Sequence, residues 1–206
     1  MTLHNHFDKV ASIYNFFSGI LIKHKKIANK IKQLSNYKTN FEVLEVGGGT
    51  GLVAQYFTNA NEIIVLDPSK KMLDKIRNTK IKKVQGIAQK IPFKDNHFDL
   101  VYCVDSFHHF VNGVKEKDYE KTFDICIKEL LRVLNKKGTL VVIDFYIEKK
   151  GFWIKFIPFM ENHLMKWGSK FFTREEMKKL FLKYNVNVEI YDVDKITYAA
   201  KITKKQ

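Results

Sequence analysis

The sequence has no long apolar run and few cysteines, and each shortage excludes a class of protein. No apolar stretch approaches the ~20 residues that cross a membrane. Residues 1–20 lack the regions of a signal peptide, so we expect a cytoplasmic protein. Cys103 and Cys126 cannot build a disulfide framework, and we expect them to be reduced, partly buried thiols. No Cys/His cluster has metal-ligand spacing, so no metal is expected.

Arginine is scarce in an otherwise basic chain. The formal net charge is +14, yet the arginines are limited to Arg77, Arg132 and Arg174. Selective readout of phosphates or bases favours clustered arginine. Lysines spread along the chain are typical of solvated helix faces. Nucleic acid is therefore the weaker alternative among partners.

The apolar pattern predicts one α/β domain. The 206 residues, 45% hydrophobic and 28% charged, fit a single globular unit without repeats or linkers. From 41 to 146 the chain alternates strand-like and helix-like segments at βαβ spacing, which predicts a parallel sheet. Strands are expected at 41–46, 62–67, 82–86, 98–104 and 139–146, helices near 51–59, 69–78 and 118–134, and a final strand pair at 186–190 and 196–202.

Residues 43–51, Val-Leu-Glu-Val-Gly-Gly-Gly-Thr-Gly, carry the strongest local signal. They predict a buried strand, a tight turn and a helix start. Glycines in such a turn allow positive φ and let a ligand lie against bare backbone. The following helix would point its N–H groups into the same space.

Asp67 ends the next apolar run, 67 − 47 = 20 residues after Gly47. An acid at this place can accept hydrogen bonds from ribose hydroxyls. The dinucleotide fingerprint would need a glycine at position 52, where the chain has Leu52. The spacing here is G-x-G-x-G directly after Glu45, and together with Asp67 it resembles the class I S-adenosylmethionine-dependent methyltransferases.

Further motifs strengthen the resemblance in chain order. Segments 7–15, 86–93, 95–109 and 132–140 resemble that family's F-D-x-x-A-x-x-Y-D, G-D-A-x-x-L-P-F, D-x-x-F-D-x-V with L-H-H, and R-V-L-K-P-G-G-x-L motifs. They are most similar to the quinone and demethylmenaquinone (type 11) group. The resemblance implies a Rossmann-like three-layer sandwich with a seven-stranded, mostly parallel sheet of order 3-2-1-4-5-7-6, its last strand antiparallel. It also implies one domain over residues 1–206, with S-adenosylmethionine as cofactor and S-adenosylhomocysteine as product.

The resemblance also implies how the cofactor is held. Glu45 would hold its amino-acid end, Asp67 its ribose, and Pro68 with Met72 its adenine, although Met72 could equally be core. Ile87 replaces a family Asp, which leaves adenine recognition to the backbone and Gln89. The expected cofactor residues are Tyr14, Glu45, Gly47, Gly48, Gly49, Thr50, Gly51, Asp67, Pro68, Met72, Ile87, Ala88, Gln89, Cys103 and Val104.

Two segments would surround the acceptor. Residues 4–34, with Tyr14, would form a helical cap, or else an ordinary packing helix. The aromatic segment 147–172 is interpreted as an inserted lid, with simple packing or peripheral membrane contact as alternatives. His108 is the candidate general base near the transferring methyl group, with a packing histidine as the alternative.

The leading hypothesis is a methyltransferase for a small apolar or aromatic acceptor, such as a quinone. A basic charge keeps an RNA or protein methyltransferase as a second possibility. The third is a non-catalytic cofactor-binding subunit that serves a partner, motivated by Ile87 and the uncertain base.

Overall fold

The computed structural model describes residues 23–164 and 167–205, and its centre is one seven-stranded sheet of order β3-β2-β1-β4-β5-β7-β6. The strands are β1 (Glu42–Val46), β2 (Glu62–Asp67), β3 (Ile81–Gln85), β4 (Phe98–Val104), β5 (Leu134–Phe145), β6 (Val186–Asp192) and β7 (Thr197–Lys204). Strands β1 to β5 pair in parallel, whereas β7 runs antiparallel to both β5 and β6. The predicted fold class and strand order are confirmed.

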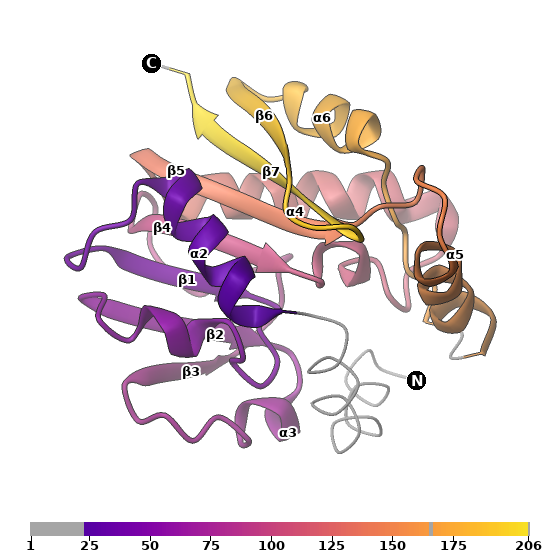
Figure 1. Ribbon diagram of the computed structural model, residues 1–206. Helices are drawn as coiled ribbons and strands as arrows, with labels where there is room; N and C mark the ends of the chain where they lie inside the picture. Colours follow the sequence, from indigo (N-terminus) through magenta and orange to yellow (C-terminus); the bar gives the residue numbers. More distant parts are fainter. Residues whose placement is uncertain (1–22, 165–166, 206) are drawn as a thin grey trace.

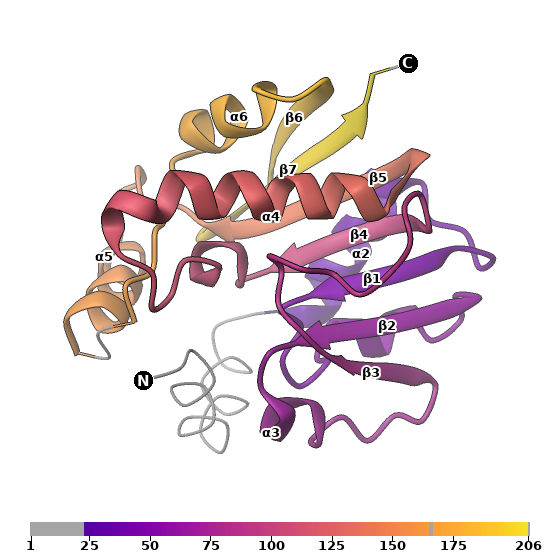
Figure 2. The same ribbon diagram turned by 180° about the vertical axis from the view of Figure 1, so that it is seen from behind.

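Helices cover both faces of this sheet (Figures 1 and 2). Helix α2 (His24–Ser35) lies on one face, and α4 (Tyr119–Val133) and α6 (Arg174–Leu182) lie on the other. Each has an apolar stripe at helical spacing, such as Phe123, Ile127 and Leu130 on α4. Thr173 and Glu176 form a capping box at the start of α6.

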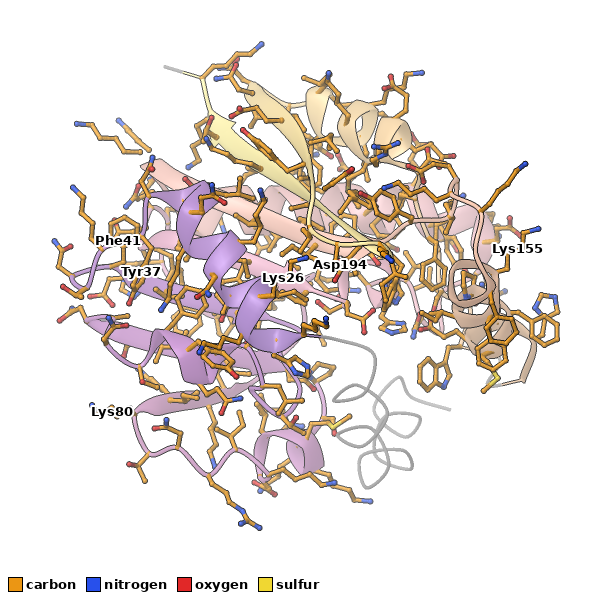
Figure 3. The ribbon with its side chains drawn as sticks, viewed as in Figure 1. Lys26, Tyr37, Phe41, Lys80, Lys155 and Asp194 are labelled. Atoms are coloured by element: carbon orange, nitrogen blue, oxygen red, sulfur yellow. The ribbon has the colours of Figure 1, made fainter. Side chains whose placement is uncertain are left out.

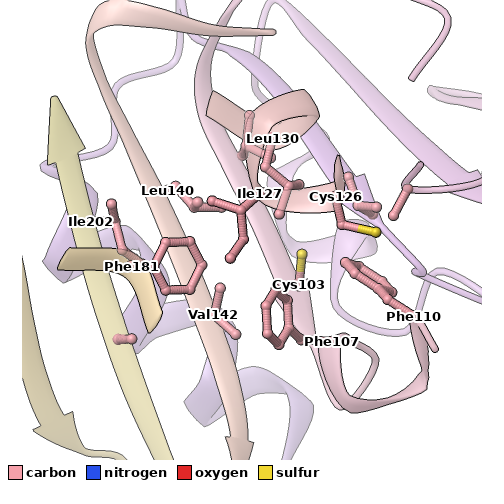
Figure 4. Close-up of a cluster of buried hydrophobic side chains, with 14 of the residues drawn as sticks. Cys103, Phe107, Phe110, Cys126, Ile127, Leu130, Leu140, Val142, Phe181 and Ile202 are labelled. Carbon is pink, nitrogen blue, oxygen red and sulfur yellow. The ribbon is translucent and has the colours of Figure 1, made fainter. Parts of the chain in front are cut away.

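Alternating side chains of the strands build two cores. On β1, Val43 faces the α2 side and Leu44 faces the α4 side, and both are fully buried. Figure 4 shows the α4 side, where Cys103 of β4 lies among aliphatic and aromatic side chains. Both cysteines are fully buried, more deeply than expected, and both are free thiols.

Two predicted helices are much shorter than expected. The segment 51–59 contains just the 3-10 helix η1 (Ala54–Phe57), and 69–78 contains just the one-turn helix α3 (Lys70–Leu73). Gly51 has a φ of 70°, which delays the helix start. Both segments still bury apolar side chains, such as Val53 and Phe57 in the first and Met72 and Ile76 in the second, so a lack of packing does not explain the shortening.

The lid segment forms α5 (Phe152–Phe159), which continues into the π-helical turn η4 (Met160–Leu164). Strands β4 and β5 end on the side of the molecule where α5 lies (Figure 1). Short 3-10 turns, η2 (Phe107–His109) and η3 (Glu116–Asp118), lead from β4 into α4. The expected cap over 4–34 is described from residue 23 onward, where α2 packs against η1 and β5.

The surface agrees with the expected spread of lysine. Lys80 and Lys155 lie at opposite margins of the molecule, and both are exposed (Figure 3). Within the described ranges, no helix has the length and apolar character needed to cross a membrane.

Candidate cofactor and acceptor site

The glycine loop after β1 is shaped by its neighbours. Gly47 has a φ of 72°, and a Cβ there would lie 2.7 Å from Ser106 Cβ. A Cβ on Gly48 would collide with the buried side chain of Glu45. Gly49 differs, because its φ is 54° but a Cβ would meet none of the described atoms within 4 Å. Gly49 therefore presents bare backbone to open space, as a bound ligand would require.

Asp67 is held in place at the end of β2. Its Oδ2 accepts a hydrogen bond of 2.8 Å from Gly49 N–H, and its Oδ1 accepts one of 2.8 Å from Ser69 N–H. The side chain is mostly buried yet reaches the cleft wall. Fixed backbone donors orient the carboxylate before any ligand arrives.

Glu45 is buried on β1 beside the same loop. Its Oε2 accepts hydrogen bonds from Ala54 N–H at 3.1 Å and from the Tyr102 hydroxyl at 3.3 Å. Burial raises the pKa of Glu45 to about 8, and Asp67 adds to the rise, although both hydrogen bonds oppose it. With Gly48, Thr50, Val104 and His24 it lines a small hollow that adjoins the main cleft at Gly47.

The main cleft encloses about 810 Å³, including solvent at its mouth. One wall is apolar, with Pro68, Met72 and Ile87, and Ile87 is 38% exposed. Ala88 and Gln89 continue that wall, and the Gln89 amide donates a hydrogen bond of 2.7 Å to the Phe110 carbonyl. Gln89 thus joins two cleft walls, which limits its freedom to contact a nucleobase.

Other predicted residues lie outside the cleft lining. Cys103 is fully buried beneath it, and burial raises the pKa of its thiol well above the usual range, as expected for an inert thiol. Gly51 packs against Ile76, because a Cβ at Gly51 would come within 3.2 Å of the Ile76 side chain. Tyr14 lies outside the described residues.

His108 and His109 occupy the end of the cleft near η4. His108 is fully buried, its Nδ1 lies 2.7 Å from Asp144 Oδ1, and its ring stacks on Phe171 at 4.3 Å. Burial alone would lower its pKa, but Asp144 and Glu161 outweigh this and hold the pKa of His108 well above its usual range. An imidazole that keeps its proton is a poor general base.

His109 is the histidine that lines the cleft. Its Nε2 lies 3.1 Å from His108 Nε2, and its Nδ1 lies 2.9 Å from Ser169 Oγ. Burial and the neighbouring His108 lower the pKa of His109 to about 3. Trp167 makes an edge contact with its ring at 5.3 Å. The geometry therefore puts His109, and not His108, beside a molecule in the cleft.

Several residues near the cleft were missed from sequence. Asp105 and Ser106 line it directly after β4, and Asp144 and Glu161 stand behind the histidines. A carboxyl in the apolar run of β5 was a readable signal for Asp144, because an acid in a buried strand needs a partner. Glu161 carries no comparable pattern.

Comparisons with known proteins agree with this architecture. The sequence model of the methyltransferase domain (Methyltransf_11) matches residues 44–142. The ubiquinone/menaquinone biosynthesis C-methyltransferase UbiE of Pseudomonas fluorescens is 30% identical over 153 residues, and its Pseudomonas aeruginosa counterpart is 29% identical. These alignments include 68% of this chain but span 56% of the length of either relative.

Solved structures share the fold. A SAM-dependent methyltransferase from Thermotoga maritima aligns with a TM-score of 0.71 and 20% identity, covering 99% of this chain and 100% of the other. A second, from Clostridium acetobutylicum, gives a TM-score of 0.71 and 11% identity, over 97% and 99% of the two chains.

The cleft fits the cofactor that this family implies. Gly49 leaves space for a ligand against the backbone, and the fixed carboxylate of Asp67 suits sugar hydroxyls. Glu45 offers a buried carboxyl to an ammonium group, and Pro68 and Met72 offer apolar surface to a base. With the fold, the ordered motifs and the relatives in agreement, the chain belongs to the class I S-adenosylmethionine-dependent methyltransferases, in the type 11 group.

Proposed function

We propose that the chain methylates a small apolar or aromatic acceptor of the quinol type. The observation that carries the proposal is the continuity of the cleft, which runs from Asp67 past Ile87 to His109 and Phe110. Trp167 and Phe171 contact the two histidines at that end. An apolar, aromatic end is suited to a flat ring. The named activity of the two curated relatives, in ubiquinone and menaquinone biosynthesis, supports the same acceptor class.

The residues would work mainly by positioning. S-Adenosylmethionine supplies, when bound, a methyl group on a sulfonium, which needs little acid or base help to transfer. Asp67 and Glu45 would fix the donor end of the cleft, while Phe110 and Trp167 would exclude water from the acceptor end. His109 would contact the acceptor.

His108 is the predicted general base, and its surroundings favour a positioning role instead. Its imidazole is fully buried and both its nitrogens face other side chains, Asp144 on one side and His109 on the other. It could reach an acceptor only through His109. We therefore assign His108 a positioning role in the proposed reaction.

The test is methyl transfer from labelled S-adenosylmethionine to a panel of benzoquinols, naphthoquinols and simple phenols. The expected result is one labelled product from a quinol, with donor binding detected by isothermal titration. Donor binding without turnover on any acceptor in the panel or in a lysate metabolite pool would instead support a non-catalytic subunit.

The same assay separates the RNA alternative. RNA as substrate should bind tightly with a steep loss of affinity as salt rises, because lysines would neutralise phosphates. Transfer of the label to RNA and not to any quinol would contradict the proposed acceptor class. The cytoplasmic location stays a prediction.

Peripheral membrane contact is a second candidate property of the lid segment. Phe152 is 69% exposed and Phe159 is 50% exposed on α5. Lys149, Lys150 and Lys155 lie nearby in sequence, a combination that suits an anionic bilayer surface. Flotation with vesicles containing phosphatidylglycerol tests it, and equal recovery with neutral vesicles would reject the electrostatic part.

A further inference from the structure

Five ionisable side chains meet at the end of the cleft, and the proposed reaction does not need all of them. Asp105, His108 and His109 follow β4, Asp144 belongs to β5, and Glu161 comes from η4. Elements far apart in the sequence thus bring three acids and two imidazoles into one mostly buried cluster.

The acids of this cluster have oxygens without hydrogen bonds. Within the described part of the chain, Asp105 Oδ1, Asp144 Oδ2 and Glu161 Oε2 are buried and accept no hydrogen bond. Asp144 is 2% exposed and Glu161 is 9% exposed. Burying carboxylate oxygens without donors is costly, and structures usually satisfy them with a partner, water or ion. The facing donor of two of these acids is His108 Nε2, which lies 3.5 Å from Glu161 Oε2 and 3.9 Å from Asp105 Oδ1, so a metal ion that replaces the Nε2 proton would give them a closer partner.

The distances around His108 suit one ion. Its Nε2 lies 3.1 Å from His109 Nε2, 3.5 Å from Glu161 Oε2 and 3.9 Å from Asp105 Oδ1. Ligand atoms bound tetrahedrally at ~2.0–2.1 Å are ~3.3–3.4 Å apart. The ligand atoms of His108, His109 and Glu161 all lie within 4.8 Å of one another. Small side-chain movements would therefore complete a coordination shell.

A histidine that binds a metal ion usually donates its other ring N–H to a carboxylate that does not touch the ion, and Asp144 is placed for this role. Its Oδ1 lies 2.7 Å from His108 Nδ1 and also accepts a hydrogen bond from Phe145 N–H. A carboxylate that holds one ring nitrogen directs the other nitrogen toward the ion. Here the second nitrogen faces His109 and Glu161.

We propose that the chain binds one divalent transition-metal ion of the Zn²⁺ type through His108, His109, Glu161 and Asp105, with Asp144 orienting His108. Nitrogen and carboxylate ligands in this number are typical of zinc, and two negative ligands balance a 2+ charge. The ion would join η4 to the ends of β4 and β5. This inference concerns metal binding alone and does not rest on the proposed acceptor or donor.

The test is Zn²⁺ binding to the full chain after treatment with a chelator. Titration calorimetry and elemental mass spectrometry should find roughly one ion per chain. Glu161→Gln should weaken binding at least tenfold, and Asp144→Asn should weaken it roughly 10- to 100-fold, as outer partners do. His163→Ala is the matched control, because His163 is an exposed histidine on the same π-helical turn. It should bind like the wild type.

Co²⁺ provides a readout of geometry. The wild type and His163→Ala should give the intense visible absorption of a four-coordinate ion, and Asp105→Asn and Glu161→Gln should lose it. Circular dichroism and melting of each variant without metal confirm that it folds. Absence of stoichiometric Zn²⁺ in the wild type, or equal binding by folded Glu161→Gln, overturns the proposal.

Discussion

Gly49 N–H donates a hydrogen bond of 2.8 Å to Asp67 Oδ2, which joins the loop after β1 to the end of β2. The other oxygen of Asp67 accepts from Ser69 N–H, so the carboxylate cannot rotate without losing a bond. Two neighbouring parallel strands thus deliver bare backbone and a fixed acid to the same edge of the sheet. The part of the cleft proposed for the donor is therefore preorganised.

Gly49→Ala should impair donor binding more than folding. A non-glycine residue at this positive φ costs about 1–2 kcal/mol of stability, and the new methyl group would occupy the space open to the cleft. We expect S-adenosylmethionine affinity, measured by calorimetry, to fall by roughly tenfold or more, which is about 1.4 kcal/mol. Gly113→Ala is the control, because Gly113 also has a positive φ but lies outside the cleft lining. Equal affinity in both variants would contradict the site.

Asp67→Asn should weaken binding of the donor while the protein still folds. One carboxylate oxygen becomes an NH₂ group that faces a backbone N–H donor, so a hydrogen bond is lost at a cost of about 1–3 kcal/mol. Binding should weaken by at least roughly tenfold, since an amide is also a poorer acceptor for hydroxyls. Asp74→Asn, at the exposed residue that follows α3, is the control and should bind the donor normally. A normal dissociation constant for Asp67→Asn would remove the ribose role.

The contribution of Glu45 to the stability of the cofactor-free chain should fall as pH rises. Glu45 titrates near 8 in the fold and near 4.5 as a free side chain. The native state therefore holds one more proton than the unfolded state between those values, and its advantage is lost as pH rises through 8. The decline should be on the order of 4 kcal/mol. Urea denaturation from pH 5 to 9 measures this decline in the free energy of unfolding. Glu45→Gln should show a smaller decline than the wild type over the same range.

Donor binding should release a proton from Glu45 near pH 7. An ammonium group beside this carboxyl favours its ionised form and lowers its pKa. Calorimetry in buffers with different ionisation enthalpies measures the release directly. Wild type should lose a fraction of a proton and Glu45→Gln none. Identical buffer dependence would show that Glu45 does not meet the charge of the donor.

Trp167→Ala should affect the acceptor and spare the donor. The Trp167 ring contacts His109 at the end of the cleft proposed for the acceptor. KM for a quinol should rise several-fold, with the S-adenosylmethionine dissociation constant unchanged. Phe159→Ala is the control, because Phe159 is also an aromatic residue of segment 147–172 but is exposed on α5. It should leave KM unchanged. The opposite order of effects would contradict the assigned acceptor end.

Arg132→Lys should destabilise the fold. The guanidinium donates to both carboxylate oxygens of Glu129, to Asp95 and to the carbonyls of Ile91 and Phe93. Lysine cannot reproduce this planar set of donors, so the loss should be about 1–3 kcal/mol. Chemical denaturation measures it. Arg77→Lys is the control at a position with higher exposure.

Several buried strands could be predicted from sequence almost to the residue, but β5 begins at Leu134, five residues before its predicted start at 139. β2 and β4 have the expected bounds, and β1 starts one residue late, because burial on both faces makes such strands continuous apolar runs. The predicted helices 51–59 and 69–78 are reduced to the short helices η1 and α3, although each segment buries several apolar side chains, because periodicity alone does not fix the length of a helix. The strand order came from the resemblance and not from the pattern.

The parts of the site that depend on local sequence could be predicted. Gly49 lies in the turn after β1 and Asp67 is the last residue of β2, and parallel strands end at the same edge, so local sequence predicted that both would line one cleft. Asp144 and Glu161 were missed because their meeting with His108 depends on how β5 and η4 lie in space. The choice between His108 and His109 depends on ring direction, which spacing does not encode.

Strand β7 lies between β5 and β6 although it is later in sequence than both. While the ribosome is synthesising β6, this strand has no neighbour in the sheet, and the edge of β5 stays open. Neither β6 nor this edge of β5 can pair until Thr197–Lys204, which forms β7, has left the exit tunnel. The last third of the sheet must therefore close as one late event, and until then the open edge of β5 is a surface for chaperones to shield.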